Sequence, residues 1–122
     1  MAHAEGPFNR QPFDHRQHVK FAWSVLKESS VAEAMEVVGS EIREFAQDRA
    51  PGKYHETLTQ FWVLLVAHTR VYAKPGEDFD EHVARFPILM DSKAQMRHYS
   101  STVLWSERAR KEFVQPDLLA MP

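Results

Sequence analysis

The stretch that decides the fold is KYHETLTQFWVLLVAHTRVYA, residues 53–73. Its apolar side chains recur every three or four residues, which predicts a helix, and the apolar stripe is wide enough for neighbours on two sides. The stripe consists of Leu58, Trp62, Leu65, Thr69 and Tyr72, widened by Phe61, Leu64 and Val71. Pro51-Gly52 before it and Lys74-Pro75-Gly76 after it are turn signals. We therefore expect residues 53–73 to form the central helix.

Two further long helices are expected before residues 53–73. Asp14 is a candidate N-cap of a helix that runs to about Glu28, and Ser29-Ser30 separates it from a second helix over about 31–48. Both segments carry apolar residues at helical spacing, so each should bury one face. The connections are short, which favours antiparallel neighbours and an up-down-up order of the three long helices.

Beyond the central helix the pattern is less regular. A helix is expected over 78–86, one or two turns over 92–98, and a last helix over 106–114 before an extended tail. Residues 1–12, rich in proline and glycine, are expected to be an irregular lead-in to one helical domain of residues 13–122. The predicted fold class is all-α: a small bundle of three long helices with short C-terminal helices packed across it.

The composition narrows the function classes. The chain has 122 residues, 43% of them hydrophobic, which suits one compact domain. The formal net charge is -2 and the basic residues are scattered, so we expect no nucleic-acid and no membrane partner. Because there is no cysteine, a metal could be held only by imidazole, carboxylate or water. The longest apolar run, residues 61–67, is too short to span a bilayer and no signal-peptide pattern is present, so a soluble cytoplasmic protein is expected.

Three histidines fall at the starts of two predicted helices, His15 and His18 in the first and His55 in the third. An up-down-up order places these two helix starts at the same end of the bundle. Three neutral imidazoles with a carboxylate or a water molecule suit zinc or iron in an open, catalytic-type site. The sequence therefore predicts a metal ion ligated by these three histidines.

Polar neighbours of the histidines supply the other groups that such a site needs. Glu56 would be a fourth ligand or a general base, and Tyr54 or Tyr99 would donate a proton to the substrate. The remaining candidate ligand-binding residues are Lys53, Thr59 and His98. In this hypothesis the protein is a small metal-dependent enzyme that activates water for hydrolysis, hydration or lyase chemistry on a small molecule.

Two other hypotheses remain open for the same residues. A metal-free pocket would bind a small anionic molecule, because helix N-termini carry partial positive charge that favours anions and disfavours cations. Alternatively, the histidines are incidental and the chain is a helical interaction module. Because a chain this short has limited room for a deep pocket, a homodimer that covers or completes the site is a further expectation. A zinc-protease motif is rejected, because Thr59 stands where the HExxH pattern starting at His55 needs its second histidine.

The motifs also resemble those of a family of small uncharacterised bacterial proteins. They are HxxHVxxAW starting at His15, YHET starting at Tyr54 and FVxPDL starting at Phe113, and the similarity covers about residues 13–119. The resemblance implies an all-helical fold and an important role for the histidines of the first two motifs and for Glu56. It implies no particular reaction.

Overall fold

Helices make up the regular secondary structure of residues 14–50 and 52–122, the part of the chain that the computed structural model describes. The predicted all-α class is confirmed there, and the lead-in expected at residues 1–12 lies outside the described residues. The elements in chain order are α1 (His15–Leu26), α2 (Val31–Arg49), α3 (Glu56–Arg70), α4 (Phe79–Arg85), the 3₁₀ helices η2 (Pro87–Met90) and η3 (Ala94–Arg97), α5 (Ser101–Leu104) and α6 (Glu107–Lys111).

Side-chain caps fix where the helices start. The Asp14 carboxylate accepts a hydrogen bond from the Gln17 amide at 2.9 Å, which confirms the N-cap predicted for α1. At the start of α2, Ser30 and Glu33 form a reciprocal capping box. Ser106 caps α6 as predicted, although that helix ends at Lys111 and is shorter than the predicted range. Each of these contacts satisfies amide groups that have no partner within the helix.

The central helix is shorter than the sequence pattern suggests. His55 has an extended backbone and acts as the N-cap, so α3 begins at Glu56 instead of at residue 53. At the other end α3 stops at Arg70, and the residues that follow form turns, with the Tyr72 amide bonded to the Thr69 carbonyl. The apolar pattern continues before the helix because Tyr54 still packs against the core, whereas Val71 and Tyr72 after its end are exposed.

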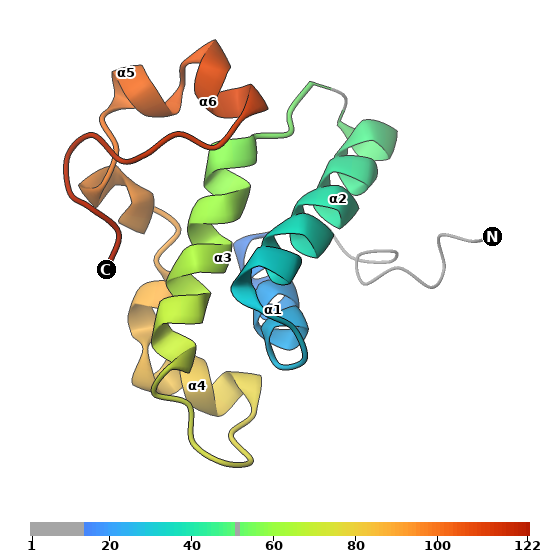
Figure 1. The fold of residues 1–122 in the computed structure, drawn as a ribbon, viewed down its shortest axis with the longest axis vertical. Helices are drawn as coiled ribbons and strands as arrows, with labels where there is room; N and C mark the ends of the chain where they lie inside the picture. The colour runs from blue at the N-terminus through green and yellow to red at the C-terminus, as the bar shows by residue number, and fades with distance from the viewer. Residues whose placement is uncertain (1–13, 51) are drawn as a thin grey trace.

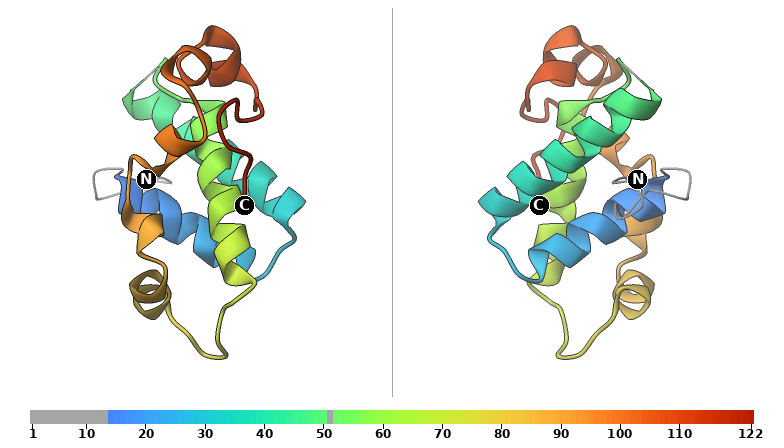
Figure 2. Two further views of the ribbon diagram at one scale, coloured as in Figure 1. Left: turned by 90° about the vertical axis from the view of Figure 1, so that its left-hand side faces the viewer. Right: turned by 90° about the vertical axis from the view of Figure 1, so that its right-hand side faces the viewer.

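Helix α3 is the centre of the core. It packs against α1 and α2, which also contact each other, and against α6 and η2. Figures 1 and 2 show α1 and α2 crossing α3 obliquely, with α5 and α6 at its N-terminal end and α4 at its C-terminal end. The side chains of Phe61, Val63 and Val66 are fully buried. A helix surrounded in this way needs apolar residues on most of its circumference, which is what its sequence supplies.

One glycine allows α2 and α3 to approach closely. A Cβ atom at Gly39 would lie 2.8 Å from Gln60 Nε2. That amide nitrogen donates to the Met35 carbonyl of α2 at 2.9 Å and to Glu56 Oε2 at 3.2 Å. The absence of a side chain at Gly39 thus makes room for a polar contact that joins the two helices.

The C-terminal tail folds back onto the molecule. The amides of Leu118 and Leu119 donate to the His98 carbonyl, and the Ser100 amide donates to Asp117. Thr57 on α3 also bonds this region through the Glu112 carbonyl. The tail therefore covers part of the core instead of extending away from it (Figure 2). Within the described residues, no helix is both long and apolar enough to cross a membrane.

Candidate functional site

The first turn of α1, the last turns of α2 and the start of α3 enclose a cavity of about 520 Å³. We call it the histidine pocket. Its lining residues are His18, Ile42, Phe45, Ala46, Arg49, Ala50, Lys53, Tyr54, His55, Leu58 and Thr59. The structure thus brings together five of the side chains predicted from the sequence, namely His18, Lys53, Tyr54, His55 and Thr59.

His18 contributes a buried imidazole to the pocket wall. Its side chain belongs to the core-facing side of α1, and the residue is 7% exposed. Burial and, to a smaller extent, the nearby His15 ring lower the pKa of His18 to about 4, against an opposing hydrogen bond to the Thr59 backbone. Because a buried imidazolium is poorly solvated, the ring is neutral at pH 7. It can exchange hydrogen bonds with a ligand without presenting a charge.

His55 joins three parts of the chain. Its Nδ1 accepts a hydrogen bond from the Leu58 amide at 3.1 Å, so this nitrogen carries no proton. Its Nε2 then carries the proton and donates to the Leu104 carbonyl of α5 at 2.7 Å. Burial lowers the pKa of His55, as does Arg110, whereas the Leu104 carbonyl raises it. Both ring nitrogens are therefore committed to the protein, and the ring is held in one tautomer.

The pocket combines an apolar interior with a positively charged mouth. Ile42, Phe45 and Leu58 form the apolar wall. Arg49 and Lys53 also line the pocket, but both are exposed and so lie at its opening. The Arg49 guanidinium is 4.1 Å from the centre of the Phe45 ring, a cation–π contact that restricts its position. The histidine pocket is thus suited to a molecule with one apolar and one negatively charged part.

Tyr54 and Glu56 interact with each other. The Tyr54 hydroxyl donates to Glu56 Oε1 at 2.5 Å, and Arg43 donates to the same oxygen at 3.3 Å. Burial, followed by the bond to Glu56, raises the pKa of Tyr54 well above its ordinary value. Glu56 lines a separate groove between α2 and α3, together with Arg43 and Gln60. Its carboxylate positions Tyr54 and is not part of the wall of the histidine pocket.

His15 points in a different direction from His18. Its Nε2 donates to the Leu89 carbonyl of η2 at 2.7 Å, and its ring meets Trp62 edge-on at 4.3 Å between centres. It does not belong to the lining of the histidine pocket. Over residues 14–50 and 52–122, no three His, Asp or Glu side chains are placed to hold one ion. The zinc or iron ligation predicted for His15, His18 and His55 therefore stays a prediction that this arrangement does not support.

His98 and Tyr99 hold the C-terminal tail. His98 Nδ1 donates to the Leu119 carbonyl at 2.8 Å, and the Tyr99 hydroxyl donates to the Val114 carbonyl at 2.7 Å. Both side chains are buried, and burial raises the pKa of Tyr99 to about 12. Neither residue lines the histidine pocket. Their contacts fit a structural role better than the proton-donating or ligand-binding roles predicted from the sequence.

The sequence analysis missed the contribution of α2. Ile42, Phe45 and Arg49 follow one another at helical spacing, so they share a face near the end of that helix. The up-down-up hypothesis implies that the end of α2 lies beside the histidines, although we did not draw this conclusion from the sequence. Combining the spacing with that hypothesis would have identified both the apolar wall and the second cation.

Comparisons with known proteins add no relatives. No protein-family model, no curated protein and no solved structure matches this chain. The resemblance carried by the motifs that start at His15, Tyr54 and Phe113 therefore stays a prediction. Inference about function rests on the geometry and chemistry of the site.

Proposed function

We propose that the histidine pocket binds a small amphipathic anion, such as a medium-chain carboxylate. The observation that carries this proposal is one cavity with an apolar wall, neutral imidazoles and two cations at its mouth. The ligand's hydrocarbon part would contact Phe45 and Leu58, and its carboxylate would lie between Arg49 and Lys53. The up-down-up order of the long helices is part of the proposal, because it brings the starts of α1 and α3 to the end of α2.

The size and chemistry of the pocket support this class of ligand. About 520 Å³ lies within the usual range for small-molecule sites. Burial of about 120 Å² of hydrocarbon contributes about 3 kcal/mol, and a charge-assisted hydrogen bond to the carboxylate adds about 2 kcal/mol. After the cost of association, an affinity in the micromolar to millimolar range is expected. His18 and Thr59 would provide neutral hydrogen-bonding groups deeper in the cavity.

A ligand series tests the proposal. Octanoate, octanol and butyrate are titrated into the protein by calorimetry. Octanoate should bind most tightly, because octanol lacks the charge and butyrate lacks most of the apolar surface. The double variant Arg49→Gln/Lys53→Gln should remove the preference for octanoate over octanol. Lys93→Gln, which removes an exposed cation outside the pocket, should leave it unchanged.

A variant that fills the cavity provides the second arm. Ala46 lines the pocket and is half-buried, so Ala46→Phe should occupy the space and abolish octanoate binding. Circular dichroism and thermal unfolding of this variant report whether the fold persists. Equal affinity for octanol and octanoate, or undiminished octanoate binding by a folded Ala46→Phe protein, would refute the proposed function.

A further inference from the structure

A second hollow lies on the molecule away from the histidine pocket. It is an open groove of about 740 Å³ between α1, the end of α3 and the connection that leads into α4. We call it the cationic groove. Its lining residues are Lys20, Trp23, Lys27, Arg70, Ala73, Lys74, Pro75, Gly76, Glu77, Asp78, Phe79 and Asp80. It shares no lining residue with the histidine pocket.

Two cations of the groove lie against the same aromatic ring. Lys27 Nζ is 4.8 Å and the Arg70 guanidinium carbon is 5.4 Å from the Trp23 ring. Trp23 is itself held in place, because it is 5% exposed and meets Phe79 edge-on at 5.7 Å. Cation–π contacts therefore hold both positive charges against one fixed ring. Both residues line the groove, so an anion in the groove would be attracted by both cations.

The groove's three carboxylates are already compensated by other groups. Asp80 pairs with Arg16 of α1. Asp78 caps α4, accepting from the Glu81 amide at 2.8 Å. Arg16 thus neutralises Asp80, and the cap engages Asp78, so neither carboxylate is a dedicated partner for the lysines of the groove.

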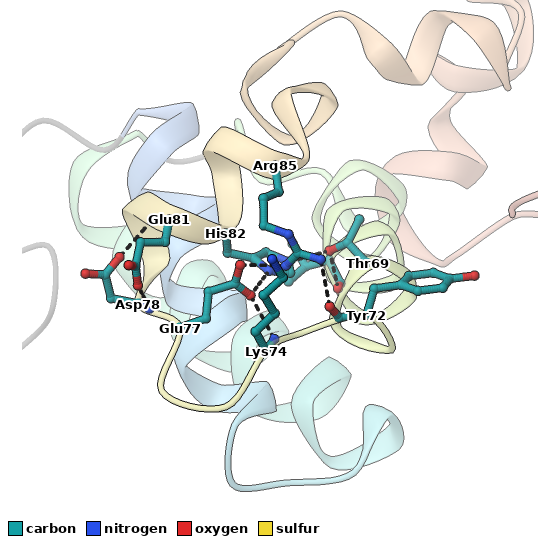
Figure 3. Close-up of polar contacts among 9 residues, drawn as sticks. Thr69, Tyr72, Lys74, Glu77, Asp78, Glu81, His82 and Arg85 are labelled. Atoms are coloured by element: carbon teal, nitrogen blue, oxygen red, sulfur yellow. Dashed lines mark hydrogen bonds and ion pairs between the residues drawn. The ribbon is translucent and has the colours of Figure 1, made fainter.

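Glu77 is the most strongly engaged of the three. Its side chain is 4% exposed and accepts from His82 Nδ1 at 2.9 Å, from Arg85 at 2.5 Å and from the Lys74 amide at 3.2 Å (Figure 3). Burial raises the pKa of Glu77, but the bonds from His82 and Arg85 outweigh it and lower the pKa to about 2. Glu77 thus stays ionised, and its carboxylate is engaged by His82, Arg85 and the Lys74 amide.

The same network fixes the wall of the groove. His82 is fully buried, and its Nε2 is 2.9 Å from the Thr69 hydroxyl near the end of α3. Arg85 donates to the Tyr72 carbonyl at 2.9 Å. Figure 3 shows these contacts tying α4 to the segment that carries Lys74. The Lys74 backbone is therefore held at the groove without the need for a ligand.

We propose that the cationic groove binds the phosphate or pyrophosphate group of a small molecule. Four cations from α1, α3 and the following connection surround one concavity, and a multiply charged oxyanion can contact several of them at once. Lys27 and Arg70 would hold the anion at the Trp23 platform, with Lys20 and Lys74 at the sides. The net charge of the chain is -2, so the positive potential is local and suits a small ligand better than a long polyanion.

Calorimetry with inorganic pyrophosphate as the probe tests this site. One pyrophosphate should bind per chain, with an affinity that falls as salt is added. Lys27→Gln and Arg70→Gln should each weaken pyrophosphate binding by about tenfold. Lys27→Arg, which keeps the charge, should bind pyrophosphate nearly as tightly as the parent protein. Lys93→Gln is the matched control for loss of one surface charge. Lys53→Gln is the control for the histidine pocket, so the two sites can fail independently.

Several outcomes would overturn the assignment. The first is that pyrophosphate does not bind at low salt. The second is that Lys93→Gln weakens binding as much as Lys27→Gln or Arg70→Gln does. The third is that the double variant Lys27→Gln/Arg70→Gln binds pyrophosphate as tightly as the parent protein. Tighter binding of a short oligonucleotide than of pyrophosphate would refute the small-molecule class. Lys27 is exposed and Arg70 is half-buried, so thermal unfolding of each variant checks that the protein remains folded.

Discussion

Acidification should destabilise the protein through His18, and the size of the effect follows from its burial. The folded-state pKa is about 4, below the ordinary value of 6.5 that applies to the unfolded chain. The folded state therefore prefers the neutral ring, and the unfolded state takes up the proton first. This contribution to stability is complete above pH 6.5 and is lost as the pH falls toward 4. The loss is about 2 kcal/mol by about pH 5 and about 3 kcal/mol in full.

Urea unfolding at a series of pH values measures this loss. A change of about 2 kcal/mol moves the urea midpoint by roughly 1 M between about pH 8 and pH 5. His18→Gln removes the titrating group. Over the same pH interval, the urea midpoint of this variant should therefore fall by roughly 1 M less than that of the parent protein. His68→Gln is the control, because His68 is on α3 and exposed. If His18→Gln and the parent protein lose equal stability, or if NMR titrates the His18 ring near 6.5, the reasoning fails.

Three further predictions concern contacts between separate segments of the chain. His55→Ala should lower the free energy of unfolding by about 2 kcal/mol in urea, because it removes an N-cap and the bond to Leu104. His55→Asn should recover about half of this loss by restoring the cap. Equal losses for the two variants would contradict this. Gly39→Ala should lower the melting temperature despite the better helix propensity of alanine, since the new Cβ would lie 2.8 Å from Gln60 Nε2. A higher melting temperature would show that the Gln60 amide moves aside without cost. Tyr99→Phe should lower the free energy of unfolding by about 1 kcal/mol, because the hydroxyl's bond to the Val114 carbonyl is lost. The same variant should increase protease cleavage of the tail. Unchanged cleavage would count against a tethering role for Tyr99.

The fold class could be read from the sequence because it depends on local signals. Caps at Asp14 and Ser30, together with the apolar spacing, predicted where α1 and α2 begin. The start of α3 was harder to predict from the sequence, because histidine is not a usual N-cap and the helical pattern extends upstream of His55. Periodicity reports which side of a segment is apolar, but it does not report which residue supplies the cap.

The site could be predicted only in part, for a geometric reason. His15 and His18 are three residues apart, so their side chains leave α1 in directions that differ by about 60°. That difference is enough to send one ring into the pocket and the other to the Leu89 carbonyl. The position of η2 depends on how the chain packs after Pro87, which no local pattern encodes. The contacts of His98 and Tyr99 with the tail are equally long-range.

The hydrogen bonds of His55 make the N-terminal end of α3 sensitive to protonation of this ring. A proton added at Nδ1 would displace the Leu58 amide from the only lone pair that this nitrogen offers. This event would loosen the helix start and one side of the cavity, whereas the Nε2 bond to the Leu104 carbonyl would persist, because Nε2 keeps its proton. Because burial lowers the pKa of His55, occupancy of the cavity and the integrity of the start of α3 should fall together only once the pH is below the ordinary titration range of histidine.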